Sequence, residues 1–178
     1  SSSAVKIVHA LPGRKILFIP DQNLGAWVRK QCPEKEIILW DGCCPVHNSI
    51  TQQDVLRAKA QHPSAKLAMH PECPPEALQH ADMVGATSAI IDYALQNGQE
   101  DIIFGTECGV YNDLIQKYPK RHFYQLRGDK LICPDMKMTS LQDVYLAVTG
   151  AGGEEIVLEE PLRKAAKRSL DNMLKYGG

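Results

Sequence analysis

The sequence predicts an α/β protein made of repeated three-layer αβα units with parallel sheets. Three observations carry this prediction. Short apolar runs alternate with amphipathic runs, Gly- and Pro-containing turns separate them, and one strand–helix–strand pattern occurs twice. Such alternation favours parallel strands joined by right-handed helical crossovers, with helices on the faces of the sheet.

Six short, turn-bounded apolar runs are predicted to be strands. In chain order they are Lys15–Ile19, Glu36–Trp40, Lys66–Met69, Asp82–Gly85, Asp101–Phe104 and His122–Gln125. In parallel sheets, ligands collect at the carboxyl ends of strands, where helices begin. Polar residues directly after these runs are therefore candidates for a functional site.

Helical periodicity fills the segments between the strands and the end of the chain. The predicted helices are Leu24–Gln31, Thr51–Gln61, Pro75–Gln79, Ser88–Asn97, Gly109–Lys117, Ser140–Thr149 and Glu160–Lys175. The first eight residues also read as the start of a helix. Thr51 and Ser140 each stand three residues before an aspartate, which is the hydroxyl-x-x-acid pattern of a capped helix start.

Two stretches share an order of features that indicates an internal duplication. One runs from Ile16 to Cys44 and the other from Ile102 to Cys133, and a proline follows each cysteine. Each contains a strand, a Gly-containing turn, a helix, a Pro-plus-basic turn and a strand. Repeats of this size are typical of duplicated units, which would direct both cysteines to a common centre. Chance similarity between two generic βαβ pieces is the alternative.

Composition excludes several classes of function. The 178 residues are 44% hydrophobic and 23% charged with a net charge of −1, so bulk charge does not indicate a nucleic-acid or membrane partner. The sequence has no apolar run of the roughly 20 residues that span a bilayer, and its start does not resemble a secretory signal. Reduced cysteines in the cytoplasm, some of them binding metal, are therefore expected.

Cys44 and Cys133 are the cysteines best placed for metal binding. Each follows a predicted strand and precedes a proline, which frees it from strand pairing, and a following helix start favours the thiolate that iron–sulfur clusters need. A buried, inert thiol is the alternative for each. Neighbouring Cys43 is expected to be a bystander. His47, three residues after Cys44, is either a further ligand or a polar contact in the loop.

His70 and Glu72 follow the predicted strand Lys66–Met69 directly. Pro71 holds the backbone extended between them, so both side chains are expected to reach one cavity at the carboxyl end of the sheet. There the carboxylate is a candidate general base, and the imidazole is a candidate to share proton transfer or hold a carbonyl. A turn with solvated polar residues is the alternative.

Two hydroxyl-rich segments precede helices. Thr87 and Ser88 follow Gly85 and Ala86, and Ser1 opens a run of three serines. Free backbone amides and hydroxyls at a helix start bind phosphate or carboxylate. The same residues also serve as ordinary helix caps, which is the alternative.

Several stretches, in order along the whole chain, resemble the quinolinate synthase family. They are Trp40-Asp-Gly-Cys-Cys44-Pro-Val-His47, His70-Pro-Glu-Cys-Pro-Pro75, Ala81-Asp-Met-Val-Gly-Ala-Thr-Ser88, Cys133-Pro-Asp-Met-Lys-Met-Thr139 and the opening Ser1-Ser-Ser-Ala-Val-Lys-Ile-Val8. The resemblance implies three αβα units around a pseudo-threefold axis and a central [4Fe–4S] cluster held by three cysteines. It also implies condensation of iminoaspartate with dihydroxyacetone phosphate in NAD biosynthesis, with loss of water and phosphate.

The resemblance also assigns roles. Cys44 and Cys133 match two of the three ligand cysteines, and one iron has no protein ligand. His70 and Glu72 match catalytic and substrate-binding residues, with Glu72 as the proton shuttle, whereas Cys73 matches no ligand position. Ser1, Thr87 and Ser88 match the segments that hold substrate phosphate or carboxylate.

The resemblance further divides the chain and shows departures from the family. Residues 1–44 correspond to most of the second unit and 45–132 to the third. Residues 133–178 form a ligand loop with helices that pack toward the first unit. That first unit and its ligand cysteine are absent here, so we expect a fragment that needs this segment as another chain or piece.

Ala86 stands where the family usually has serine, and Pro45 where some members have histidine.

Two other functions remain open on the sequence. A noncatalytic αβα protein would only bind a small anion. A zinc hydrolase would use Cys44, His47 and His70, although no zinc spacing pattern is satisfied.

Overall fold

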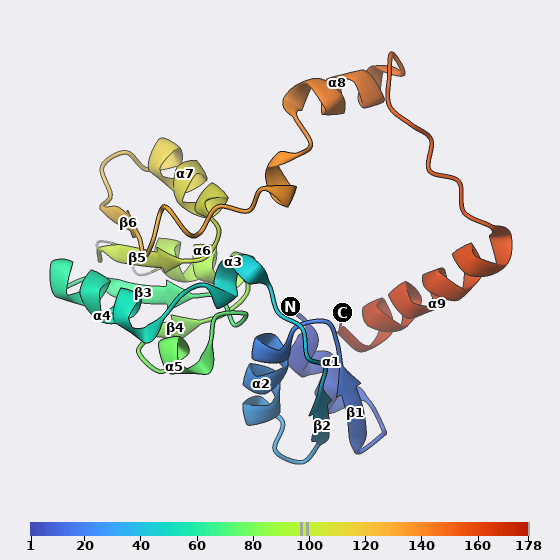
Figure 1. Cartoon of the computed structure of the whole chain (residues 1–178), viewed down its shortest axis with the longest axis horizontal. Helices are drawn as coiled ribbons and strands as arrows, with labels where there is room; N and C mark the ends of the chain where they lie inside the picture. The colour runs from blue at the N-terminus through green and yellow to red at the C-terminus, as the bar shows by residue number, and fades with distance from the viewer. Residues whose placement is uncertain (97, 99, 178) are drawn as a thin grey trace. The chain divides into compact units, whose positions relative to one another are not determined.

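The computed structural model describes residues 1–96, 98 and 100–177. The chain forms two compact units, Ser1–Ile132 and Cys133–Gly178. Figure 1 shows the order of the elements along the chain. The first unit contains α1 (Ala4–Ala10), β1 (Lys15–Phe18), α2 (Gln22–Gln31), β2 (Glu36–Leu39), α3 (Pro45–Asn48), α4 (Gln52–Gln61), β3 (Lys66–Met69), α5 (Pro75–Leu78), β4 (Met83–Val84), α6 (Thr87–Gln96), β5 (Ile102–Gly105), α7 (Cys108–Lys117) and β6 (Phe123–Gln125).

The predicted elements of this unit form at the predicted places. All six strands are present, with each end within one residue of the prediction. The helix expected over Ser88–Asn97 begins one residue earlier, and Asn97 lies outside the described residues. The short helix α3 was not predicted, because four residues are too few to show a helical period. Pro45 occupies its first turn, where a missing N–H costs no hydrogen bond.

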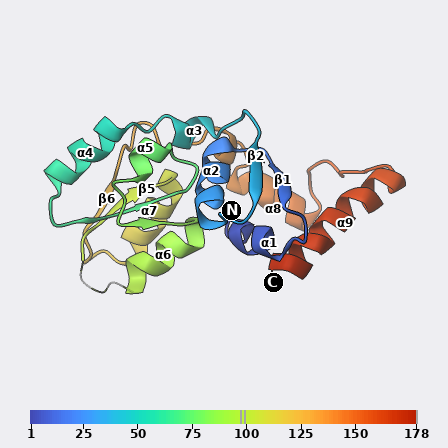
Figure 2. The same cartoon turned by 90° about the horizontal axis from the view of Figure 1, so that it is seen from below.

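The larger sheet is parallel, with strand order β4-β3-β5-β6. Alternate residues of its strands point to opposite faces, so two cores form. Leu67, Met69 and Ile103 pack under α4 and α5, whereas Ala68 and Phe104 pack under α6 and α7. Figure 2 shows α5 and α6 on opposite sides of β5. This half of the unit is therefore a three-layer αβα sandwich, as the sequence predicted.

The smaller sheet pairs β1 with β2, also in parallel. Its core lies against α1 and α2 and includes Val8, Val28 and Ile37. A Cβ added to Gly25 would lie 2.6 Å from a side-chain carbon of Leu39, so glycine lets α2 approach the sheet closely. The β1–α2–β2 and β5–α7–β6 segments are both parallel βαβ units, the arrangement that the repeat predicts.

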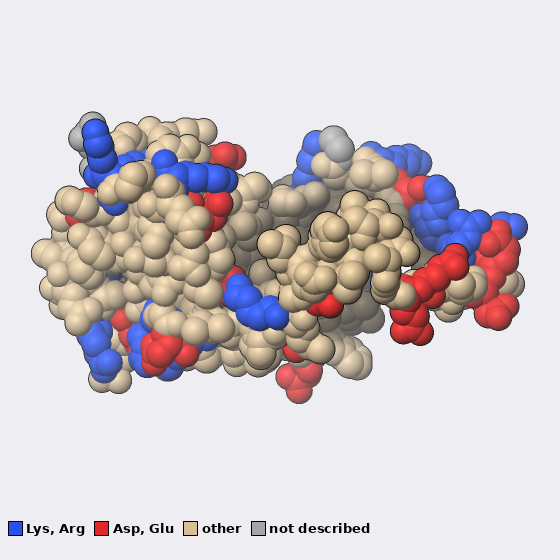
Figure 3. All heavy atoms as spheres, turned by 90° about the horizontal axis from the view of Figure 1, so that it is seen from above, with Lys and Arg blue, Asp and Glu red and all other residues tan. Residues whose placement is uncertain are grey.

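The second unit contains a 3-10 helix, η1 (Asp135–Lys137), and the helices α8 (Leu141–Thr149) and α9 (Glu160–Gly177). Ser140 and Asp143 form the capping box that the sequence predicted at the start of α8. In residues 133–177 no side chain is buried. Across the part of the chain that the structure describes, no helix is long and apolar enough to cross a membrane. Acidic and basic side chains are interspersed on the face in Figure 3.

Candidate functional site

The carboxyl ends of β3 and β5 lie side by side and carry the first polar residues of the site. Met69 pairs with Gly105 in the sheet, and the amide of His70 donates to the Gly105 carbonyl at 3.0 Å. The chain then turns through the fully buried Pro71. This turn brings His70 Nδ1 to 3.7 Å from Glu72 Oε2. The two side chains that the sequence singled out therefore lie together at the carboxyl edge of the sheet.

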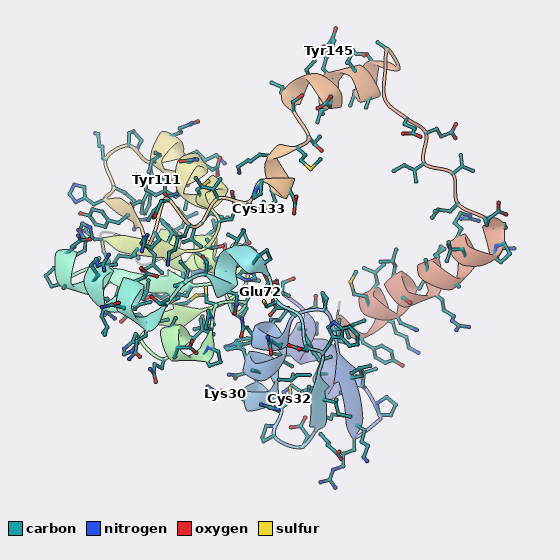
Figure 4. All side chains as sticks on the ribbon, in the orientation of Figure 1. Lys30, Cys32, Glu72, Tyr111, Cys133 and Tyr145 are labelled. Carbon is teal, nitrogen blue, oxygen red and sulfur yellow. The ribbon has the colours of Figure 1, made fainter. Side chains whose placement is uncertain are left out.

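His47 reaches the same place from α3. Its Nδ1 lies 3.1 Å from Glu72 Oε2, and its Nε2 lies 3.4 Å from the hydroxyl of Thr106. Its ring stacks on that of His70 with centroids 4.6 Å apart and planes inclined by 16°. Both nitrogens of His47 therefore have polar partners, so the structure shows the polar contact that was one of the two interpretations of this residue. Figure 4 labels Glu72 at this position.

The hydrogen bonds show which groups can donate and which can accept. The Glu72 carboxylate accepts, so His47 donates to it from Nδ1, while His47 Nε2 lies beside the Thr106 hydroxyl, which can either donate or accept. The amide of Glu72 points at His70 Nδ1, 3.4 Å away, which leaves the proton of a neutral His70 on Nε2. His70 thus presents an N–H donor, and Glu72 an oxygen acceptor.

Burial and neighbouring charges set the pKa values of this group. Burial and the charge of His47 lower the pKa of His70 to about 4, against the opposing effect of Glu72. The hydrogen bond from His47 lowers the pKa of Glu72 despite its partial burial. At neutral pH the pair is a neutral imidazole beside a carboxylate.

We expect the ring nitrogens of His70 to show the neutral Nε2–H tautomer in nitrogen-detected NMR spectra at pH 7. The spectrum should stay unchanged on acidification until about pH 5, since protonation follows a pKa of about 4. The His70→Gln variant assigns the signal. A midpoint near the ordinary histidine value of about 6.5 would contradict the described environment.

Asp21 anchors the backbone of Cys44. It is buried, its Oδ1 accepts from the amide of Leu24 at the start of α2, and its Oδ2 accepts from the amide of Cys44, both at 2.7 Å. Cys44 is the residue before α3 and is half-buried. Its sulfur, a His47 ring nitrogen and a Glu72 oxygen all lie within 4.8 Å of one another. One thiol, one imidazole and one carboxylate therefore converge at this edge of the sheet.

The start of α3 favours the Cys44 thiolate, as expected, but burial outweighs this effect. Burial raises the pKa of this thiol, and the amides of His47 and Val46, which lower it, do not compensate. The helix α3 has only four residues, so it offers few aligned peptide groups. A bound cation would supply the missing stabilisation of the thiolate.

The other cysteines occupy different environments. Cys43 is exposed, and Cys32, Cys73 and Cys108 are buried. Burial raises the pKa of the Cys73 thiol far above its ordinary value, and its sulfur faces the Gly105 carbonyl. Cys73 is therefore placed as a packing residue.

The remaining predicted site residues are less closely tied to this group. Thr87 and Ser88 are exposed at the start of α6, and Ser1 is exposed before α1. In residues 1–96, 98 and 100–132, no hydrogen bond joins these three residues to Glu72. Cys133, labelled in Figure 4, is half-buried and belongs to the second unit, so its meeting with Cys44 remains a prediction.

Asp21 and Thr106 are the polar residues of the site that sequence reasoning missed. Thr106 directly follows β5, as His70 follows β3, so the rule that polar residues cluster after buried strands could have found it. Asp21 caps the start of α2, but its second oxygen accepts a hydrogen bond from the amide of Cys44, 23 positions away. No local pattern reports that contact.

The comparisons with known proteins agree along the chain. The profile described as quinolinate synthetase A protein matches residues 1–175. The quinolinate synthase of Caldicellulosiruptor bescii is 46% identical over 177 residues, which are 99% of this chain and 58% of that protein. Those of Caldicellulosiruptor saccharolyticus and Alkaliphilus metalliredigens are 46% and 42% identical over 98% of this chain and 57% of each protein. This chain thus spans less than three-fifths of the length of these relatives. It belongs to the quinolinate synthetase A family.

Proposed function

We propose that this chain takes part in quinolinate synthesis, the condensation of iminoaspartate with dihydroxyacetone phosphate in NAD biosynthesis. One observation carries the proposal. The Glu72 carboxylate lies beside two imidazoles that stack on each other, 3.1 Å from His47 Nδ1 and 3.7 Å from His70 Nδ1, and within 4.8 Å of the Cys44 sulfur at the carboxyl edge of a parallel sheet. Such a carboxylate is ionised at neutral pH and can therefore accept a proton from a bound substrate.

Each side chain has a role in this proposal. Glu72 removes a proton from the carbon beside the substrate carbonyl and delivers it to a leaving hydroxyl. His70, neutral and carrying its proton on Nε2, donates a hydrogen bond to a substrate carbonyl oxygen. His47 and Thr106 fix the orientation of Glu72. Ser1, Thr87 and Ser88 hold phosphate or carboxylate groups with their hydroxyls and the amides around them.

Cys44 and Cys133 are proposed as two ligands of a [4Fe–4S] cluster. The donor set fits, because thiolates are the ligands that such a cluster requires and both sulfurs belong to half-buried residues. When bound, a cluster with one iron free of protein ligands supplies a Lewis acid at this site. The third thiolate would come from residues beyond these 178, either in the same polypeptide or as a separate piece. The division into residues 1–44, 45–132 and 133–178 remains part of this proposal.

A hybrid enzyme tests the function. In it, this chain replaces the matching 58% of the Caldicellulosiruptor bescii relative. After anaerobic reconstitution with iron and sulfide, we expect the hybrid to make quinolinate and the 178-residue chain alone to make none. An inactive hybrid that folds and carries a full cluster would contradict the proposal. Phosphate binding without activity would favour the noncatalytic alternative.

The adjacent cysteines offer a matched pair for the cluster ligand. Cys44→Ser is expected to reduce the iron content of the reconstituted hybrid from about four atoms per chain to less than one. Cys43→Ser, at an exposed position one residue away, should leave it unchanged. The same measurement separates the zinc hydrolase, which predicts one zinc per chain. In the structure the third member of that candidate zinc group is Glu72 and not His70.

A further inference from the structure

A second group of metal-binding side chains lies in the smaller βαβ unit, apart from the Glu72 group. His9 is in the last turn of α1, Cys32 directly follows α2, and Glu34 lies in the turn before β2. The sulfur of Cys32 is 3.5 Å from His9 Nε2, and His9 Nδ1 is 2.7 Å from Glu34 Oε1. One ligand atom from each residue lies within 4.8 Å of the other two. Figure 4 labels Cys32 at the end of α2.

The spacing matches that of a tetrahedral metal site. With Zn–S near 2.3 Å and Zn–N near 2.1 Å, two ligands at the tetrahedral angle have their donor atoms about 3.6 Å apart. The observed distance from Cys32 to His9 Nε2 is 3.5 Å. Glu34 contacts the opposite ring nitrogen, where carboxylates orient metal-binding histidines. To bind the metal directly as well, the half-exposed Glu34 side chain would have to leave His9 Nδ1 and turn toward Cys32.

We propose that His9, Cys32 and Glu34 form a binding site for a zinc-class divalent cation. Cys32 is fully buried under the half-exposed His9 and Glu34, so solvent reaches the site from their side. Lys35 also lies near the site, but its ammonium donates hydrogen bonds to the carbonyls of Leu11 and Gly13. A thiolate, an imidazole and a carboxylate are the ligands that this class of metal takes, with a water in the fourth position.

A cation at this position would connect α1 to the turn between α2 and β2. Val5 and Val8 of α1 already pack on the core that contains Cys32. The helix α1 begins three residues after Ser1. By holding α1, the cation would also stabilise the helix that follows Ser1. This structural role does not depend on the proposed function.

Cobalt(II) is the probe for this site. The metal-free 178-residue chain carrying Cys44→Ser, which removes the thiol of the other group, is titrated with Co²⁺ under reducing, anaerobic conditions. We expect one equivalent to bind with a thiolate-to-cobalt charge-transfer band and intense visible bands of four-coordinate cobalt. Zn²⁺ should displace it and raise the Tm by about 5 °C.

Variants of Cys32 and His9 decide the outcome. Adding Cys32→Ala should abolish the charge-transfer band, and His9→Gln should weaken Co²⁺ binding at least about tenfold. Because His9 is half-exposed, the His9→Gln variant still reports on Co²⁺ binding if the change at Cys32 impairs folding. His122→Gln is the matched control, because His122 is an exposed histidine directly before β6. Absence of the band, or its survival without Cys32, would overturn the proposal.

Discussion

Replacing Glu72 with glutamine is expected to reduce quinolinate formation by the hybrid enzyme about a thousandfold. Glutamine has nearly the same shape, and its carbonyl oxygen still accepts the hydrogen bond that His47 Nδ1 gives to Glu72 Oε2 at 3.1 Å. It cannot take up a proton at neutral pH. The loss should therefore appear in kcat, with little change in KM.

Steady-state rates of quinolinate formation measure this effect, with iron content determined on the same samples. Glu36→Gln serves as the matched control, because Glu36 is an exposed carboxylate whose ion pair with Lys15 spans 3.7 Å. That variant should retain full activity. A Glu72→Gln enzyme within tenfold of the parent, with its cluster intact, would remove Glu72 from the proton-transfer role.

The second large effect is expected on stability, from Asp54→Asn. The carboxylate of Asp54, only 5% exposed, joins the start of α4 to the loop after β6. It accepts hydrogen bonds from Thr51, Arg127 and Lys130, and Lys130 also donates to the Ser49 carbonyl. Burial alone would raise the pKa of Asp54, but these donors hold it well below the ordinary range.

Removing this charge leaves two cations without their common partner. We expect the free energy of unfolding to fall by about 3 kcal/mol, since breaking a buried pair from one side is costly, and the Tm to fall by about 10 °C. Asp129→Asn is the control. Its carboxylate also pairs with Arg127 but is 66% exposed, so the change should cost less than about 1 kcal/mol.

The stabilisation by the Asp54 carboxylate should also depend on pH, in a direction that follows from its lowered pKa. The pKa of Asp54 is lowered on folding, so its contribution is fully present above the unfolded value near 3.8 and is lost as the pH falls below it. The difference between wild type and Asp54→Asn in urea unfolding should therefore be constant near pH 7 and shrink at pH 3. An equal difference at both pH values would show that the charge is not its source.

Local sequence patterns predicted the fold well because they act over a few residues. Apolar runs such as Lys66–Met69 and the capping patterns at Thr51 and Ser140 each report a local backbone preference, and the structure places elements there. The four-residue helix α3 escaped because one turn shows no period. Its absence from the prediction also left the position of His47 undefined.

The sequence by itself determined the parallel α/β architecture, the family, and the pairing of His70 with Glu72, because two residues around a buried proline at a strand end cannot separate far. Only the tertiary structure decided the long-range partners. The contacts of His47 with Glu72 and Thr106, of Asp21 with Cys44, and of His9 with Cys32 join residues 23 to 59 positions apart. The physical reason is that strand order and helix packing bring these atoms together. Burial, which also depends on packing, then shifts the pKa values of Cys44, Cys73 and His70.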